Sequence, residues 1–288
     1  MHKHTKKEVD IIPKIMKFFS LEIPWKIKVI PEGLSNRNYF VKTRNKGYFV
    51  KFIGNQNVKL IKNDIAIQNQ LQKGDILTPM YLKNQDGRYI FQENDFMVVV
   101  SEKIEGITPR KVNKSLAFSI GEVLAKFHTL VKKLPYDIKG WMDVQTSEII
   151  SDDVKKLKNT ELPLGITHGD MHNGNVLILR NNLDEVYAIL DFEEVGRDLL
   201  LVDLARSIIG VCYTEDGNRL DSDLVKAELN GYESIRALTD HEKSVLSSAI
   251  NYAAEVCIKW FIDNGYEKYV DNHKSRAKSF VSPFDING

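Results

Sequence analysis

Short runs rich in β-branched and aromatic residues dominate the first hundred positions of the chain, and such runs predict β-strands. They lie at residues 25–30, 38–43, 47–53, 88–91 and 96–100. Asn45 and Gly47, where the second run gives way to the third, indicate a hairpin turn. Residues 59–76 differ, because their apolar positions approach helical spacing and Gly74 is a typical helix stop. We expect one helix there.

After Pro109 the apolar spacing becomes helical. In residues 115–134 one helical stripe contains Leu116, Ile120, Val123, Leu124, Phe127, Val131 and Leu134. Two short strands are expected at 176–179 and 186–190, and helix predominates from about Leu200. The pattern predicts a two-lobed α+β fold. It has a β-rich N-lobe with one main helix at 1–100, a hinge at 101–106, and a larger, mostly helical C-lobe at 107–288.

Composition narrows the function classes. The 288 residues include 40 Lys+Arg and 39 Asp+Glu, so the chain lacks the basic excess typical of a nucleic-acid-binding protein. No apolar run approaches the length of a membrane span, and the basic N-terminus lacks the apolar core of a signal peptide. Cys212 and Cys257 have no metal-binding or redox spacing. We therefore expect a cytoplasmic protein with reduced thiols, no nucleic-acid or membrane partner, and a monomeric or homodimeric state.

The richest chemistry lies in "ITHGDMHNGNVLI", residues 166–178. His168 and Asp170 precede Asn175, a hairpin follows, and Asp191 begins "DFE". Phosphoryl transfer needs a carboxylate that accepts the hydroxyl proton, together with an amide and a second carboxylate that hold Mg²⁺ against the phosphates. A loop and a hairpin would bring these groups together. The ordered set therefore predicts a catalytic loop for phosphoryl transfer.

Two other interpretations fit part of the same segment. Gly-Asp and Asn-Gly pairs commonly form plain turns. His168, Asp170 and His172 could instead bind a transition metal, as in a metal-dependent hydrolase. That second interpretation explains neither Asn175 nor Asp191.

At these residues the chain resembles the aminoglycoside phosphotransferase and choline kinase superfamily, which has a protein-kinase-like fold. The resemblance rests on "HGDMHNGNVLI" and "ILDFEEV", in which Gly169 and Glu193 replace the Arg and Gly of protein kinases. "EGLSNRNYFVKT", "DLLLVDLARSI" and "LNGYESIRALTDHEKSVL" are similar to type II homoserine kinases. Together these segments run from about residue 30 to residue 265.

The resemblance implies roles for individual residues. Asp170 would be the catalytic base, and Asn175 and Asp191 would be the Mg²⁺ ligands. Lys51 would pair with the α- and β-phosphates of ATP. Asp64 stands where the family has a helix carboxylate that orients this lysine, although Glu is usual there.

The resemblance also implies how the nucleotide and the catalytic loop are held. The phosphates would lie against a loop at residues 33–38 that contains Gly33, Ser35, Asn36 and Asn38. The adenine would be bound by the carbonyl of Ser101 and the N–H of Lys103, groups that any side chain tolerates. His168 and Asp203 would support the backbone of the catalytic loop.

The leading hypothesis is an ATP- and Mg²⁺-dependent kinase that phosphorylates a hydroxyl on a small molecule. The favoured substrate is homoserine or a similar amino acid or amino alcohol. Acidic residues could face its ammonium group, and Arg197 or Arg206 its carboxylate; the acids are Glu193, Glu194 and Asp198. These charges could equally be surface or structural ion pairs. The alternatives are an antibiotic phosphotransferase for an aminoglycoside or spectinomycin-like compound, and a non-catalytic kinase-like binding protein.

Overall fold

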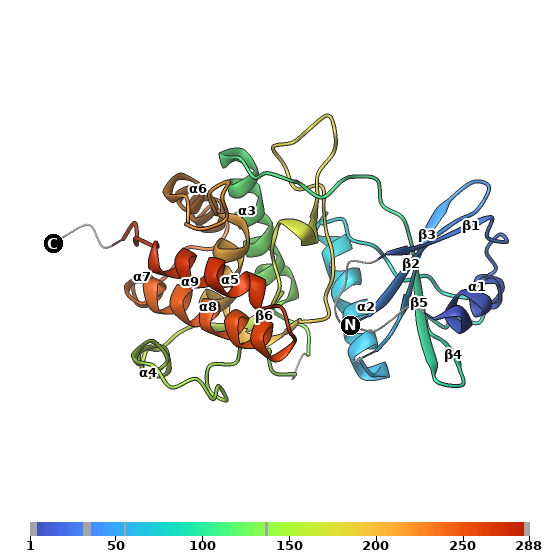
Figure 1. Ribbon diagram of the computed structural model, residues 1–288, viewed down its shortest axis with the longest axis horizontal. Coiled ribbons are helices and arrows are strands. Elements are labelled where there is room, and N and C mark those ends of the chain that lie inside the picture. Colours follow the sequence, from blue (N-terminus) through green and yellow to red (C-terminus); the bar gives the residue numbers. More distant parts are fainter. Residues whose placement is uncertain (1–4, 31–35, 55, 136–137, 285–288) are drawn as a thin grey trace. The chain divides into compact units, whose positions relative to one another are not determined.

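The computed structural model describes residues 5–30, 36–54, 56–135 and 138–284 (Figure 1). The chain divides into two compact units. Unit 1 contains residues 1–69 and 78–105, and unit 2 contains residues 70–77 and 106–288. Strands concentrate in the first unit and helices in the second, which confirms the predicted α+β class.

Unit 1 is built on an antiparallel five-stranded sheet with the order β1-β2-β3-β5-β4. Its strands are β1 (Lys26–Ile30), β2 (Arg37–Lys42), β3 (Gly47–Phe52), β4 (Phe91–Glu93) and β5 (Phe96–Glu102). Four of them lie where the apolar runs predicted strands. The strand expected at 88–91 instead begins at Phe91, where it pairs with Val98 of β5.

One helix packs on each face of this sheet. Successive residues of a strand point to opposite faces, so Val98 and Val100 of β5 lie in a core with Ile12 and Ile15 of α1 (Lys6–Phe18). Val99 points the other way and packs against Ile61 of α2 (Val58–Lys73). The expectation of a single main helix in the first hundred residues was therefore wrong.

Unit 2 is mostly helical, and its helices bury the larger core. They are α3 (Lys114–Val131), α4 (Asp152–Asn159), α5 (Leu200–Val211), α6 (Ser222–Glu233), α7 (Asp240–Ser244), α8 (Leu246–Asp263) and α9 (Val270–Lys278), with short 3₁₀ turns η1 (Asn173–Asn175) and η2 (Glu267–Tyr269). The expected helices at 115–134 and beyond Leu200 are confirmed. Gly121 of α3 and Gly231 of α6 let these two helices approach closely, since a Cβ at either position would lie within 2.0 Å of a carbonyl of the other helix.

Two short antiparallel ladders frame the segment that carries the predicted chemistry. Strand β6 (Leu164–Thr167) pairs with β9 (Gly196–Leu199), and β7 (Val176–Leu177) pairs with β8 (Ala188–Ile189). The chain leaves β6 directly into His168, and β9 leads directly into α5. The ladders thus fix both ends of the catalytic loop on the helical core.

The division into units differs from the predicted lobes at residues 70–77, and residues 101–105 of the expected hinge fall in unit 1. Residues 70–77 were expected in the N-lobe but belong to unit 2. Leu77 forms a bridge with Ala188 of β8, and Gly74 lies against the side chain of Leu130. In the described part of the chain, no helix is long and apolar enough to cross a membrane.

Candidate active site

A buried carboxylate holds the backbone of the loop that follows β6. Asp203 of α5 is fully buried and accepts the N–H groups of His168 at 2.7 Å and Gly169 at 2.8 Å. Gly169 has φ +79°, and a Cβ there would lie 2.2 Å from the carbonyl oxygen of Glu194. Only glycine fits this turn without displacing the neighbouring chain. These are the contacts expected of a loop-supporting Asp203.

A second hydrogen-bonded chain holds Asp203 itself. The Nε2 of His128 lies 2.9 Å from Asp203 Oδ2, and its Nδ1 lies 2.7 Å from the hydroxyl of Tyr232. Burial alone would raise the pKa of Asp203, but the side-chain hydrogen bond with His128 and the backbone hydrogen bond from His168 lower it below its ordinary value. The carboxylate is therefore ionised when it binds the loop.

The loop presents Asp170 with both carboxylate oxygens in contact with neighbours. Arg206 Nη2 donates to Oδ1 at 2.5 Å. Asn175 Nδ2 donates to Oδ2 at 3.1 Å, and His172 Nε2 lies 3.5 Å from the same oxygen. Burial would raise the pKa of Asp170, but the Arg206 charge and the His172 contact lower it to about 2. Asp170 is thus an ionised carboxylate with a fixed orientation.

The β7–β8 hairpin places the two predicted metal ligands at neighbouring register positions. Val176 pairs with Ile189, and the carbonyl of Asn175 accepts the N–H of Leu190 at 2.8 Å. Asp191 is the next residue and adopts φ +62°, a left-handed conformation that Asp tolerates better than most residues. An amide oxygen and a carboxylate are hard oxygen donors of the kind that Mg²⁺ prefers. The residue types and their register therefore fit a magnesium site.

The alternative metal centre at His168, Asp170 and His172 does not form. His168 is fully buried, its Nε2 lies 3.1 Å from the carbonyl of Leu190, and its Nδ1 accepts the N–H of Asp170 at 3.3 Å. Because both ring nitrogens are used, this histidine cannot ligate a metal. Burial also lowers the pKa of His168, so it is neutral. Among the described residues, no group of three or more His, Cys, Asp or Glu side chains is arranged to hold a metal ion.

The acidic residues assigned to the substrate lie in different environments. Glu194 is half-buried, and burial together with the charges of Asp170, Glu193 and Asp191 raises its pKa to about 7. Asp198 is only 2% exposed, because it lies against Gly140 and accepts the N–H of Leu199, so it has almost no surface that a ligand could contact. Asp198 is therefore not placed to contact a substrate.

Arg206 also differs from the expectation that it faces a substrate carboxylate. Its guanidinium binds Asp170 instead, and the residue is 9% exposed. Arg197 is exposed in β9.

In unit 1, the sheet register brings two predicted nucleotide residues together. Asn38 of β2 lies directly opposite Lys51 of β3, so their side chains share one face. Asn36 is buried and accepts the N–H of Gly54 at 2.7 Å, which ties the end of the 33–38 loop to the end of β3. Asp64 is buried in α2 and accepts a hydrogen bond from Gln56 at 3.0 Å. Gly33 and Ser35 lie outside the described residues.

The predicted adenine-binding groups lie at the end of β5, shortly before the boundary between the two units at residues 105 and 106. Ser101 is a residue of β5, between Phe49 of β3 and a bridge to Tyr81. The N–H of Lys103 already donates to the carbonyl of Gly47 at 2.9 Å. A backbone N–H supplies one donor, so that of Lys103 is not available to adenine here.

The sequence analysis did not predict several residues that support the loop after β6. Trp141 Nε1 donates to the carbonyl of Gly169 at 2.9 Å, and Asn173 Nδ2 lies 3.3 Å from the hydroxyl of Tyr213. Gly210 of α5 makes room, since a Cβ there would lie 2.7 Å from Arg206 Nη1 and 2.8 Å from His172 Cβ. Of these residues, only Gly210 could have been noticed in the sequence, because it is a glycine within a helical pattern, one turn after Arg206.

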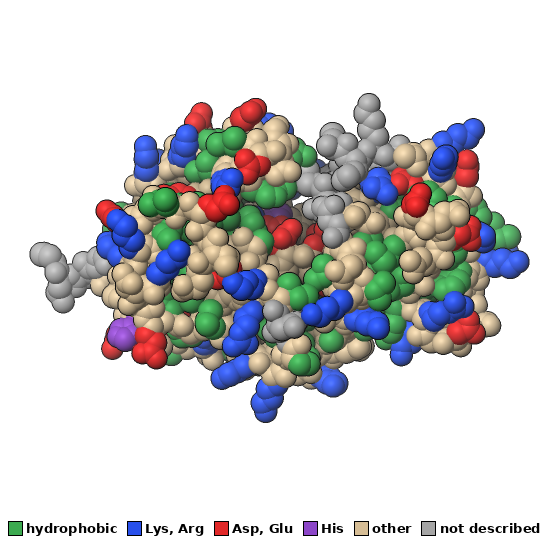
Figure 2. Space-filling view, turned by 90° about the horizontal axis from the view of Figure 1, so that it is seen from below, with side chains coloured by type: hydrophobic (Ala, Val, Ile, Leu, Met, Phe, Trp, Pro, Cys, Tyr) green, Lys and Arg blue, Asp and Glu red, His purple; other side chains and the backbone are tan. Residues whose placement is uncertain are grey.

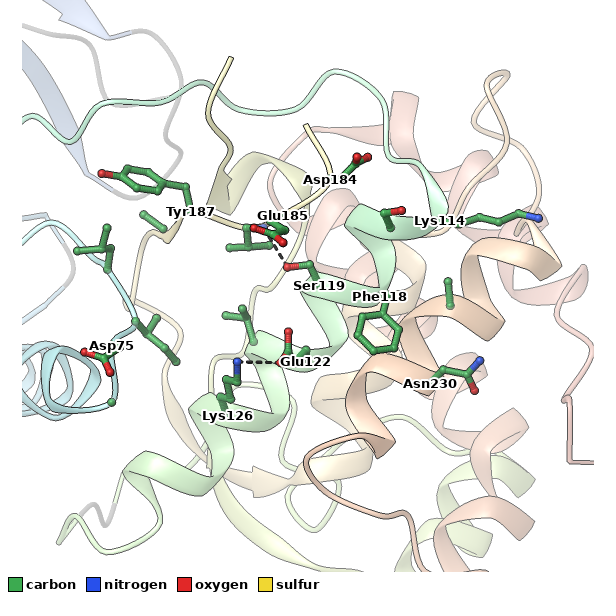
Figure 3. A pocket seen from close by; sticks show the side chains of 18 residues that line it. Asp75, Lys114, Phe118, Ser119, Glu122, Lys126, Asp184, Glu185, Tyr187 and Asn230 are labelled. Carbon is green, nitrogen blue, oxygen red and sulfur yellow. Dashed lines mark hydrogen bonds and ion pairs between the residues drawn. The ribbon is translucent and has the colours of Figure 1, made fainter. Parts of the chain in front are cut away.

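A separate cavity of about 920 Å³ is lined by α3, α6 and the segments 74–77 and 184–188 (Figure 3). In its wall Lys126 pairs with Glu122 at 2.8 Å. Ser119 accepts the N–H of Val186 there at 3.0 Å. Asp170, Asn175 and Asp191 are not among its lining residues. On the molecular face shown in Figure 2, basic side chains are spread over the surface with acidic ones among them.

The fold and the loop geometry define a kinase-like phosphotransferase. A model of the phosphotransferase enzyme family matches residues 26–149 and 143–238. These segments cover well over half of the chain, so the protein belongs to that family. It is therefore an enzyme that transfers a phosphoryl group to a hydroxyl, and the non-catalytic alternative is set aside.

Curated relatives and solved structures agree with this assignment. A homoserine kinase of Bradyrhizobium sp. (strain BTAi1) is 25% identical over 289 residues, which cover 90% of this chain and 87% of the relative. A homoserine kinase of Methylobacillus flagellatus is 25% identical, with coverage of 78% and 75%. An amicoumacin kinase solved with AMP-PNP and Ca²⁺ has a TM-score of 0.73 at 16% identity and covers 98% of both chains. A microcompartment-associated aminopropanol kinase has a TM-score of 0.66 at 14% identity, with coverage of 93% and 99%. The two structures support the fold.

Proposed function

We propose that the protein is an ATP- and Mg²⁺-dependent kinase of a small hydroxyl compound, with Asp170 as the catalytic base. The observation that carries the proposal is the ionised carboxylate of Asp170, which accepts hydrogen bonds from Arg206 and Asn175. The carbonyl of Asn175 in turn accepts the N–H of Leu190, the residue before Asp191. A positioned carboxylate of this kind orients the acceptor hydroxyl and takes its proton as the phosphoryl group arrives.

Other residues of unit 2 would bind the metal or support the loop that carries Asp170. Asn175 and Asp191 would bind Mg²⁺, which when bound neutralises charge on the phosphates. The Nδ2 of Asn175 also donates to the backbone carbonyl of Asp170 at 2.8 Å, which leaves Oδ1 as the amide atom offered to a metal. Asp203 and His168 keep the loop in place through the hydrogen bonds described above.

Unit 1 would supply the nucleotide contacts. Lys51 would bind the α- and β-phosphates and Asp64 would orient it. The loop at 33–38 would bind the phosphates through its backbone N–H groups, including that of Gly33, and through the side chains of Ser35, Asn36 and Asn38. The AMP-PNP bound in the amicoumacin kinase structure is consistent with ATP as the donor.

The proposed acceptor is homoserine or a similar amino acid or amino alcohol. The homoserine kinases among the relatives support this choice, as does the aminopropanol kinase among the structures. Burial and the charges of Asp170 and Glu193 raise the pKa of Glu194 to about 7, so a substrate ammonium beside these acidic groups would favour the ionised form of Glu194. Because Arg206 is engaged by Asp170, any substrate carboxylate would need Arg197 or another cation.

The second candidate is an antibiotic phosphotransferase. The spectinomycin phosphotransferase structure, with a TM-score of 0.63 at 13% identity, shares the fold. The acidic environment of Glu193 and Glu194 would suit a polycationic substrate as well.

The test compares wild type with Asp170→Asn. We expect the variant to bind MgATP with a Kd within threefold of wild type and to lose at least 10³-fold in turnover, because amide nitrogen cannot accept the proton. Asp216→Asn, at an exposed acidic residue of the same unit, serves as the matched control and should keep full turnover. Turnover of Asp170→Asn within tenfold of wild type would contradict the role of Asp170.

A further inference from the structure

We propose that Arg206 is a positioning residue that fixes Asp170 for proton transfer by occupying one of its two carboxylate oxygens. The inference rests on the proposed role of Asp170. It replaces the expectation that Arg206 binds a substrate carboxylate.

The geometry divides the work between the two oxygens of Asp170. Arg206 Nη2 donates a charge-assisted hydrogen bond to Oδ1. Oδ2 receives only the longer contacts from Asn175 at 3.1 Å and His172 at 3.5 Å. Oδ2 is therefore the oxygen that an acceptor hydroxyl can approach, and the Arg206 bond prevents rotation of the carboxylate away from it.

The surroundings of Arg206 are built for this one contact. The guanidinium is buried, and its Nε has no hydrogen-bond partner among the described residues. His273 and Arg276 lie near it, and burial together with the Arg206 and Arg276 charges lowers the pKa of His273 to about 4. A buried cation beside another cation is costly unless a carboxylate compensates it. Asp170 is the side chain that the described structure pairs with Arg206.

One helix carries both supports of the loop. Asp203 and Arg206 are three residues apart on α5, and Gly210 follows one turn later. Residues at this spacing share a helix face. Asp203 fixes the loop backbone at His168 and Gly169, Arg206 fixes the Asp170 side chain, and Gly210 gives the guanidinium room. A lysine would supply charge but a single point donor on a flexible stem, so it would orient the carboxylate less well.

The experiment measures ADP release with MgATP and homoserine, or with whichever alcohol of a substrate panel gives the fastest turnover. For Arg206→Met we expect kcat to fall about 100-fold, the effect of a misplaced catalytic group, while KM for MgATP and acceptor changes less than threefold. Arg206→Lys should recover about tenfold of this loss. Lys243→Met, which removes a partly buried ion pair with Glu233 elsewhere in the unit, should keep kcat within twofold.

A double variant separates positioning from a general structural effect. If Arg206 acts through Asp170, Asp170→Asn combined with Arg206→Met should turn over within threefold of Asp170→Asn alone. A further 100-fold loss in the double variant would overturn the proposal. So would an Arg206→Met kcat within threefold of wild type, or a KM for the acceptor raised more than tenfold at constant kcat, which would mark a substrate contact. Full activity of Asp170→Asn would instead contradict the proposed function, and the role of Arg206 with it.

Discussion

Replacing Asp203 by Asn tests how much of the catalytic loop depends on one buried carboxylate. Its Oδ2 accepts His168 N at 2.7 Å and His128 Nε2 at 2.9 Å, and its Oδ1 accepts Gly169 N at 2.8 Å. Asn has the same shape but only one acceptor oxygen. Whichever way its amide turns, at least one buried N–H faces another donor.

The expected cost follows from these three contacts. One orphaned buried donor costs about 1–3 kcal/mol, and the remaining hydrogen bonds lose their charge assistance, worth about 1 kcal/mol. We therefore expect Asp203→Asn to lower the free energy of unfolding by about 2–4 kcal/mol. For a unit of this size the melting temperature should fall by roughly 5–15 °C.

The assay is thermal unfolding followed by circular dichroism, together with turnover at a temperature where the variant stays folded. Turnover should fall at least tenfold, because Gly169 and Asp170 lose their anchor. Asp223→Asn, at an exposed residue paired with Lys114, is the control and should shift the melting temperature by less than 2 °C. A melting temperature and turnover of Asp203→Asn equal to those of the control would refute the reasoning.

Three further predictions concern burial, loop geometry and metal. Burial raises the pKa of Glu228 to about 7, above its unfolded value near 4.5, so its contribution to stability is present at pH 4 and is lost as pH rises through 7. Glu228→Gln should remove roughly 3 kcal/mol of this pH dependence, measured from the urea unfolding midpoints at pH 5 and pH 8. An equal change in stability between these pH values in both proteins would contradict the prediction. Gly169→Ala should lower kcat at least tenfold, since its Cβ would meet the Glu194 carbonyl at φ +79°, and unchanged kinetics would show that the turn relaxes. Chelation by EDTA should abolish ADP release, and added Mg²⁺ should restore it. Asn175→Ala should raise the Mg²⁺ concentration needed for half-maximal turnover. If this concentration equals that of wild type, Asn175 is not a metal ligand.

The strands and long helices could be predicted because their signals are local. Alternating burial in β3 and the apolar stripe of α3 appear directly in the sequence. Helix α1 was missed although Thr5 and Glu8 form a capping box, because Pro13 interrupts its pattern and its buried face becomes apparent only against the sheet. The ladder of β6 and β9 has four residues in each strand, too few for a periodic signal.

The site shows the same division between local and long-range information. Asp170, Asn175 and Asp191 were selected because a loop and a hairpin bring them together by short connections. The partner of Arg206 depends on how α5 packs beneath the loop, 36 residues away in sequence from Asp170. The acceptor of the Lys103 N–H could not be predicted for a similar reason, since the carbonyl of Gly47 belongs to another strand.

The most direct test of the account is ADP release from purified protein with ATP and Mg²⁺ across a panel of acceptors. The panel would hold homoserine, hydroxy-amino acids, choline, aminopropanol, aminoglycosides and spectinomycin, with Asp170→Asn measured beside wild type. The account predicts strong turnover with one amine-bearing alcohol, homoserine first, and its loss in the variant. Equal ADP release from wild type and Asp170→Asn with every acceptor would contradict it.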